Sequence, residues 1–226
     1  MGWVLLLIAL PLGWLGLWWW RGRQRRQRQD WIDDYPLPPG LLQRVRQTYP
    51  ALNEQQLALV ESGLRQFFRL ALAAAPRTVA MPSQAVDELW HQFILYTRNY
   101  QQFCQRAFGH YLHHTPAVRM GGPQQQRAAI RRTWQLACRE EGINPARPAR
   151  LPLLFELDAL LAIPGGFVYV PDCSTADAPA GSYCGTELGG SDSSSDDCRD
   201  SDDSCSDSDS SGDGGGDGGG CGGGGD

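Results

Sequence analysis

The sequence predicts a mainly α-helical domain of about five helices, with a small strand or hairpin arm near its C-terminal end. Three observations predict this class. Apolar residues recur at helical spacing through most of residues 30–172. Capping residues and prolines divide that stretch into separate helices. No segment alternates for long enough to form a sizeable sheet, so the domain is expected to be all-α apart from the short arm.

Three zones of composition define the expected domain organisation. Residues 1–29 are an apolar run followed by arginines, residues 30–172 have an ordinary globular composition, and residues 173–226 are mostly Ser, Asp, Gly and Cys. The middle zone, roughly 140 residues, is long enough to bury a core of its own. We therefore expect a membrane anchor, one helical domain and a disordered tail, in that order.

The first zone is typical of a single transmembrane helix. Residues 2–20, GWVLLLIALPLGWLGLWWW, carry no charge, and about 20 apolar residues span the hydrocarbon core of a bilayer. The three tryptophans at 18–20 suit the membrane interface. A cleaved signal peptide is the alternative, but it requires basic residues before the apolar run and a small-residue cleavage site. Here the basic residues follow the run, which favours an anchor.

Five arginines follow the apolar run at once. They are Arg21, Arg23, Arg25, Arg26 and Arg28. The positive-inside rule places them, and the domain after them, in the cytoplasm, with the N-terminus outside the plasma (inner) membrane. Their side chains can also bind anionic lipid headgroups. The lipid bilayer and an unidentified protein are the expected partners. Nucleic acid is not expected, because the place of the arginines beside the apolar run explains them.

That topology also bears on the seven cysteines. Disulfides are rare in the cytoplasm, where thiols are kept reduced. We therefore expect the cysteines to be free thiols and not a disulfide framework.

The helices are justified in chain order. Residues 41–50 predict a short helix that ends at Pro50. Asn53 and Gln56 form a capping-box pattern at the start of the second helix, which ends at Pro76. Ser83 is the expected N-cap of the third helix.

The third helix is expected to run without interruption to Gly109. One apolar face extends along its whole length: Val86, Trp90, Phe93, Thr97, Tyr100, Cys104 and Phe108. A fourth helix is expected over residues 124–141 and a short fifth helix within residues 151–164. The segment GGFVYVP that follows predicts the strand or hairpin arm.

All four histidines lie near this third helix: His91, His110, His113 and His114. A continuous helix holds His91 about 20 Å from Cys104, so the two cannot bind one metal ion unless the helix breaks near Arg98 and Asn99. The segment from Gly109 to His113 reaches back at most about 14 Å. His91 is therefore expected to pair with Asp87 one turn earlier. That pair is either a solvated surface pair or a means of orienting the imidazole.

The remaining metal-ligating side chains suggest a zinc site at the end of the same helix. Cys104, His113 and His114 lie close in sequence there, and Cys138 on the next helix could join them. Cysteine and histidine are the ligands that Zn²⁺ prefers. The alternative is that the two histidines cap the negative end of the helix dipole or pack against it.

The segment MPSQAVDELWHQFILYTRNYQQFCQRAFGHYLHHTP resembles the glycine-rich domain-containing protein-like family, especially its bacterial members. RTWQLACREEGINP, LPLLFELDALLAIPGGFVY and the Gly/Cys-rich end are similar too. The resemblance covers residues 35–173 and the tail. It implies membership of a largely uncharacterised family and no defined reaction. The positions that fall on the family motif are Asp87, Trp90, His91, Tyr100, Cys104, His113 and His114.

The expected function follows from these parts. The chain contains no Gly-rich phosphate loop after a strand and no Ser-centred nucleophile elbow. A non-enzymatic, membrane-tethered helical domain that binds a partner or acts as a scaffold is therefore the first hypothesis. A zinc-binding protein or metal-dependent enzyme that uses Cys104 and His113 or His114 is the alternative.

Overall fold

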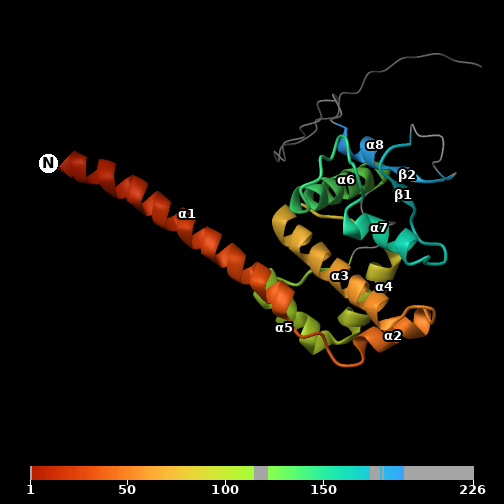
Figure 1. Ribbon diagram of the computed structural model, residues 1–226. Coiled ribbons are helices and arrows are strands. Elements are labelled where there is room, and N and C mark those ends of the chain that lie inside the picture. Colours follow the sequence, from red (N-terminus) through yellow and green to blue (C-terminus); the bar gives the residue numbers. More distant parts are fainter. Residues whose placement is uncertain (1, 115–121, 174–178, 180, 191–226) are drawn as a thin grey trace, which may run out of the picture. The chain divides into compact units, whose positions relative to one another are not determined.

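The computed structural model describes residues 2–114, 122–173, 179 and 181–190, with side chains from residue 14 onward (Figure 1). The mainly α-helical class is confirmed. The elements within these residues are α1 (Gly2–Asp34), α2 (Leu41–Thr48), α3 (Glu54–Ala74), α4 (Gln84–Leu95), α5 (Thr97–Ala107), α6 (Pro123–Glu140), α7 (Leu153–Leu160), β1 (Tyr169–Val170), β2 (Tyr183–Cys184) and α8 (Gly185–Gly189).

Helix α1 is continuous from the apolar run through the arginines to the domain. Trp14 and Trp18 are 73% and 70% exposed, whereas Ile32 near its C-terminal end is buried in the core. Within the described part of the chain, no helix combines the length and the apolar character needed to cross a membrane. The side chains of residues 2–13, most of the predicted span, lie outside that part. The transmembrane anchor therefore stays a prediction.

The capping signals of the sequence are confirmed. Asn53 Oδ1 accepts a hydrogen bond from the Gln56 amide at 2.9 Å, and Gln56 Oε1 accepts one from the Asn53 amide at the same distance. Ser83 caps α4 by accepting from the Val86 amide. Local hydrogen bonds of this kind need no distant partner, which is why the sequence alone predicts them.

The predicted continuous helix over residues 83–109 is wrong. It breaks at Tyr96, which ends α4 and begins α5 with φ −80° and ψ 61°. On a straight helix Phe93 and Phe103 would be about 15 Å apart, but their ring centroids are 5.4 Å apart. The break therefore folds α5 back so that both rings enter one aromatic core.

That core is the physical reason for the break. Phe68 of α3 contacts both Phe93 and Phe103, with ring centroids 6.4 and 4.9 Å apart. Tyr35, just after α1, contacts the same two rings. All four side chains are at most 7% exposed. Burial of an aromatic side chain is strongly favourable, so the core outweighs one interrupted turn of helix.

The C-terminal part of the domain extends further than predicted. The strand expected after residue 165 is confirmed as β1, and it pairs with β2 in parallel, Tyr169 opposite Tyr183. Helix α8 then lies on α6, and a Cβ atom at Gly185 would come within 2.6 Å of the Trp134 ring. Residues 181–190 therefore belong with the domain and not with the tail predicted to begin at residue 173. The rest of that tail, residues 191–226, lies outside the described residues.

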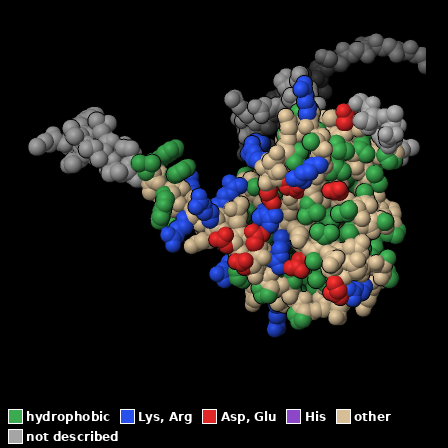
Figure 2. Space-filling view, viewed as in Figure 1, with side chains coloured by type: hydrophobic (Ala, Val, Ile, Leu, Met, Phe, Trp, Pro, Cys, Tyr) green, Lys and Arg blue, Asp and Glu red, His purple; other side chains and the backbone are tan. Residues whose placement is uncertain are grey.

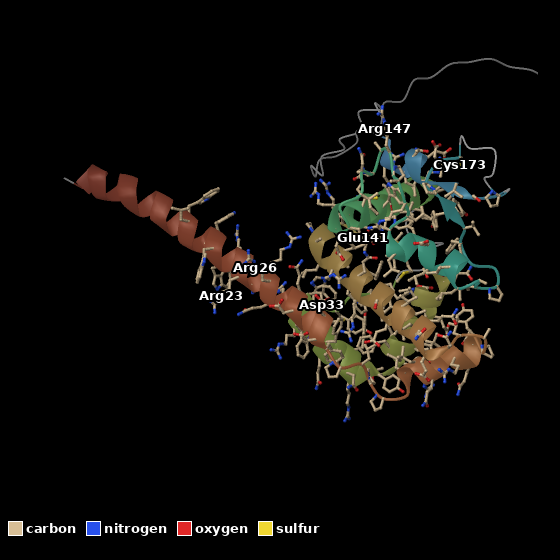
Figure 3. The ribbon with its side chains drawn as sticks, in the orientation of Figure 1. Arg23, Arg26, Asp33, Glu141, Arg147 and Cys173 are labelled. Carbon is tan, nitrogen blue, oxygen red and sulfur yellow. A yellow bond between two sulfur atoms is a disulfide. The ribbon has the colours of Figure 1, made fainter. Side chains whose placement is uncertain are left out.

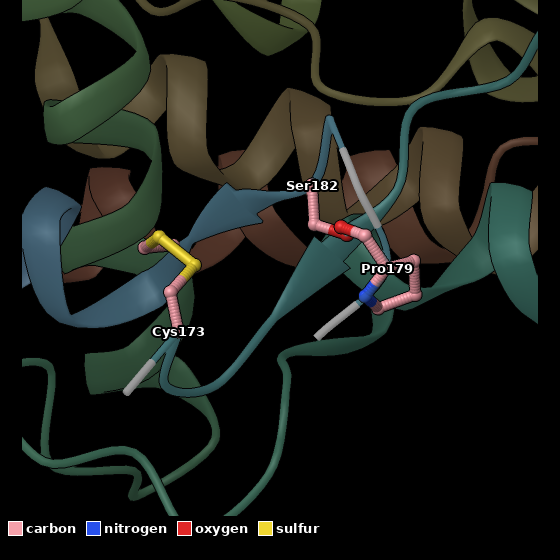
Figure 4. The surroundings of a disulfide bond; sticks show 4 residues. Cys173, Pro179 and Ser182 are labelled. Atoms are coloured by element: carbon pink, nitrogen blue, oxygen red, sulfur yellow. A yellow bond between two sulfur atoms is a disulfide. The ribbon is translucent and has the colours of Figure 1, made fainter. Parts of the chain in front are cut away.

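A disulfide joins Cys173 to Cys184, across the end of the β1–β2 pair (Figure 4). This corrects the expectation that the cysteines are all free thiols. Both residues lie in the segment expected to be disordered, so no sequence pattern predicted that they come together. Cys104 and Cys138 are free and buried.

One face of the domain carries an ion-pair network that joins three helices (Figure 2). The Arg69 guanidinium of α3 pairs with Asp33 of α1 and with Glu140 of α6. Figure 3 shows Asp33 at the end of α1, next to α3. No histidine lies on the face shown in Figure 2, so the histidine cluster described below opens elsewhere.

Candidate metal centre and its pocket

The first turn of α4 is held by a buried carboxylate from another helix. Asp158 of α7 is 2% exposed. Its two oxygens accept hydrogen bonds from the Ser83 hydroxyl at 2.6 Å, from the amides of Gln84 and Ala85, and from the Phe167 amide at 3.0 Å. A carboxylate at a helix N-terminus satisfies unpaired amides and meets the positive end of the dipole. This network fixes the turn that carries Asp87.

A second set of hydrogen bonds fixes the chain after α5. Trp90 Nε1 donates to the Tyr100 hydroxyl at 3.0 Å, and that hydroxyl donates to the Leu112 carbonyl at 2.6 Å. Tyr100 is fully buried, and burial raises the pKa of its phenol. It therefore stays a neutral donor and anchors Leu112, two residues before His114.

These two networks bring three side chains together. His114 Nε2 lies 2.8 Å from Asp87 Oδ1, and the His114 and His91 ring centroids are 4.1 Å apart. The potential ligand atoms of Asp87, His91 and His114 all lie within 4.8 Å of one another. The three side chains are 33%, 48% and 14% exposed. We call this set the Asp–His–His cluster.

The hydrogen bond of His91 determines which of its nitrogens is available. His91 Nδ1 lies 2.8 Å from the Asp87 backbone carbonyl oxygen. A carbonyl oxygen can only accept, so Nδ1 carries the hydrogen and Nε2 keeps its lone pair. Metal-binding histidines commonly donate their second N–H to a backbone carbonyl in this way. His91 therefore presents Nε2 as its ligand atom.

The cluster lines one side of a pocket of about 730 Å³. Further lining comes from α3, from the loop after it at residues 75–81, and from the segment after α5 that includes Phe108, His110, Leu112 and His113. Ligand pockets in proteins are typically about 300–1,000 Å³. The cluster thus faces a cavity large enough for a small molecule.

A family model described as UCP032817-like matches residues 27–188. The chain belongs to the UCP032817-like family. The match begins in α1 and ends in α8, so it contains the cluster, the pocket and the C-terminal segment that the disulfide holds. No curated protein and no solved structure matches the chain.

The structure of this UCP032817-like chain separates the predicted zinc ligands. Cys104 is fully buried beneath Tyr100 and Leu112, and burial raises the pKa of its thiol. Cys138 lies on α6, where burial, with a smaller contribution from Glu141, raises its pKa to about 11. A thiol must lose its proton to bind zinc. Within the described residues, neither cysteine belongs to a group of three or more metal-ligating side chains.

Only one of the two histidines predicted as zinc ligands lies in the cluster. His114 joins the cluster, whereas His113 is exposed and packs on the Tyr111 ring at 4.9 Å. His110 is also exposed, and both line the pocket. The predicted set of Cys104, His113, His114 and Cys138 therefore does not form one site.

The prediction that His91 lies far from the later histidines is wrong for His114, because the helix breaks at Tyr96. The Asp87–His91 pair at i, i+4 is confirmed, with His91 Nδ1 3.4 Å from Asp87 Oδ2. That pair was the available signal. His114, the third residue of the cluster, was not predicted to join this pair, because neither Gly nor Pro marks the turn at Tyr96.

The predicted headgroup arginines also divide in this family member. Arg21, Arg23, Arg25 and Arg26 are exposed on α1, where Figure 3 labels Arg23 and Arg26. Arg28 instead donates to the Phe108 carbonyl at 3.0 Å and lines the pocket. Arg28 is therefore a pocket residue, and the other four remain the predicted headgroup set.

Proposed function

We propose that this UCP032817-like chain binds a zinc ion through Asp87 Oδ1, His91 Nε2 and His114 Nε2. The observation that carries the proposal is the convergence of these three side chains within 4.8 Å on the wall of a pocket. Two imidazoles and one carboxylate are a ligand set that zinc takes in catalytic sites. The proposed function is thus the zinc-binding alternative of the sequence analysis, but its ligands are Asp87, His91 and His114 in place of Cys104 and His113.

The spacing of the ligand atoms is compatible with zinc after small side-chain rotations. Two ligands of a tetrahedral zinc ion at about 2.1 Å are about 3.4 Å apart. The distance from Asp87 Oδ1 to His114 Nε2 must open from 2.8 Å toward that value, and the other distances must close. Asp87 and His91 are one third and one half exposed, which leaves room for this adjustment.

The charge balance of binding can be stated atom by atom. The metal-free cluster holds a hydrogen between His114 Nε2 and the Asp87 carboxylate, because a carboxylate can only accept. Zinc requires the lone pair of Nε2, so on the neutral ring this hydrogen must move to Nδ1. His91 needs no change, since its hydrogen is already on Nδ1.

Three protein ligands leave a fourth position of a tetrahedral ion open. This position would face the pocket, where the ion could polarise a bound ligand or a water molecule. The proposed function is therefore a zinc centre that binds a small molecule. Whether a reaction follows depends on that ligand.

The test measures zinc directly. The full chain, purified without chelator, should carry about one zinc ion per chain, measured by mass spectrometry of metals. Calorimetric titration of the metal-free chain with zinc should give one binding site per chain. Asp87→Asn, His91→Ala and His114→Ala should each weaken zinc binding by about 100-fold or more.

His110→Ala is the matched control, because His110 lies on the same pocket but outside the cluster. This variant should keep full zinc content. A chain that binds no zinc at micromolar concentrations would contradict the proposal. So would a His110→Ala variant that loses zinc as completely as His114→Ala does.

We further propose that the N-terminal helix anchors the domain to a membrane. The exposed side chains Trp14, Trp18, Trp19 and Trp20, followed by the exposed arginines, support this role. Partner binding or scaffolding at the membrane is the second candidate function that this tether favours.

Two observations favour opposite sides of the membrane for the domain. The arginines favour a cytoplasmic domain, whereas the Cys173–Cys184 disulfide favours an oxidising compartment. We propose the cytoplasmic orientation. A reporter enzyme fused after Asp226 should then be active only in the cytoplasm, and activity on the outer side would reverse the orientation.

A further inference from the structure

The described lining of the pocket is rich in groups that bind anions. Arg28, Arg77, His110 and His113 line it together with the two histidines of the cluster. Its two carboxylates are already engaged. Asp87 pairs with the histidines, and Glu88 accepts from the Thr48 hydroxyl at 3.1 Å and the Gln92 amide at 2.8 Å. A zinc ion would add two further positive charges to this wall.

Arg77 is the group that an anionic ligand would use. It is exposed in the loop after α3, and no ion pair of the described residues involves it. Arg132 of α6 lies near, held by the carbonyl of Thr78 in the same loop. Burial and the charge of Arg77 lower the pKa of Arg132. Two neighbouring cations without a carboxylate partner repel each other, and a bound anion would relieve this repulsion.

Much of the remaining pocket wall is apolar. Phe67, Ala71, Leu72, Met81 and Phe108 contribute to it. An inorganic anion alone would fill little of a cavity of about 730 Å³ and would leave this wall in contact with water. Apolar surface favours a ligand with an apolar body. A pocket with cationic groups and an apolar surface favours a ligand that has an anionic end and an apolar end.

We infer that the pocket binds an amphipathic molecule with an anionic, phosphate-type head. The inference rests on the proposed zinc centre. The head would occupy the open position of the metal and pair with Arg77, and the apolar body would lie along the Phe67–Leu72 wall. Free phosphomonoesters with a hydrophobic group and the monophosphate lipid phosphatidic acid share this chemistry.

The test uses hexyl phosphate as the probe on the zinc-loaded full chain, with zinc content measured first and separately. Isothermal titration should give binding at least about tenfold tighter than that of inorganic phosphate or of 1-hexanol. Arg77→Ala should weaken hexyl phosphate binding by about tenfold. Arg147→Ala, which removes an exposed arginine outside the pocket lining, should leave it unchanged.

Each component of the inference can fail by itself. Equal binding of hexyl phosphate and hexanol would overturn the anionic head, and equal binding of hexyl phosphate and inorganic phosphate would overturn the apolar body. If zinc is bound but hexyl phosphate is not, this inference fails and the zinc proposal stands. A chain without zinc would instead contradict the proposed function itself.

A competition experiment distinguishes the two sources of the ligand. Displacement of hexyl phosphate by phosphatidic acid vesicles, and not by phosphatidylcholine vesicles, would identify a lipid ligand. No displacement by either vesicle would identify a soluble one. Displacement is the required readout because the arginines of α1 can bind anionic vesicles without the pocket.

Discussion

Two aspartates near the start of α4 have opposite surroundings. Asp158 is 2% exposed, and its oxygens accept from three backbone amides and one hydroxyl. The Asp87 side chain is 33% exposed, and its oxygens face two imidazoles on the wall of a pocket. The first carboxylate is surrounded by fixed donors from the fold itself. The second faces two imidazoles, with which we propose that it binds a metal ion.

The difference shows how to distinguish a structural carboxylate from a ligand-binding one. A buried carboxylate that accepts from backbone donors stabilises the fold, because its removal leaves those donors without an acceptor. Partly exposed side-chain partners cost little to rearrange. We therefore expect substitutions at Asp158 to act on stability and substitutions at Asp87 to act on binding.

The largest expected effect is at Asp158. Asp158→Ala leaves the Ser83 hydroxyl and the amides of Gln84, Ala85 and Phe167 without an acceptor. The free energy of unfolding should fall by about 3–5 kcal/mol. Urea denaturation followed by circular dichroism measures this. A loss below about 1 kcal/mol would mean that water replaces the carboxylate and that the comparison fails.

Tyr100→Phe should have an intermediate effect on both properties. It removes the hydroxyl that links Trp90 to the Leu112 carbonyl and keeps the buried ring. The free energy of unfolding should fall by about 1–2 kcal/mol. Zinc affinity should fall by about tenfold, because the segment before His114 loses its anchor. Unchanged zinc affinity at reduced stability would show that this hydroxyl supports the fold alone.

Asp87→Asn should have the smallest effect on stability. It removes the carboxylate that contacts two partly exposed imidazoles, so the metal-free chain should lose less than about 1 kcal/mol of unfolding free energy. Denaturation in the presence of a chelator gives this value. A loss as large as that of Asp158→Ala would mean that Asp87 also mainly stabilises the fold.

The sequence predicted those parts of the fold that depend on neighbouring residues. The cap at Ser83 and the capping box of Asn53 and Gln56 are hydrogen bonds within one turn, and both were predicted. The break at Tyr96 was not, because its cause is an aromatic core assembled from α1, α3, α4 and α5. The disulfide and the parallel strand pair likewise join residues that no local pattern connects.

The candidate site follows the same division. Asp87 and His91, one helical turn apart, were predicted as a pair, and the structure adds His114 from 23 residues beyond His91. Cys104 was proposed as a ligand because of its place in the sequence. It is fully buried beside Tyr100 and does not line the pocket.

The turn at Tyr96 has a consequence for how chains of this family can vary in length. Helix α5 works as a spacer of fixed length between His91 and His114. One inserted or deleted residue in it would rotate everything beyond by about 100° and carry His114 off the cluster. Relatives that retain the Asp–His–His cluster should therefore align without gaps from Asp87 to His114. Gaps should instead fall in places such as residues 115–121, between His114 and the start of α6.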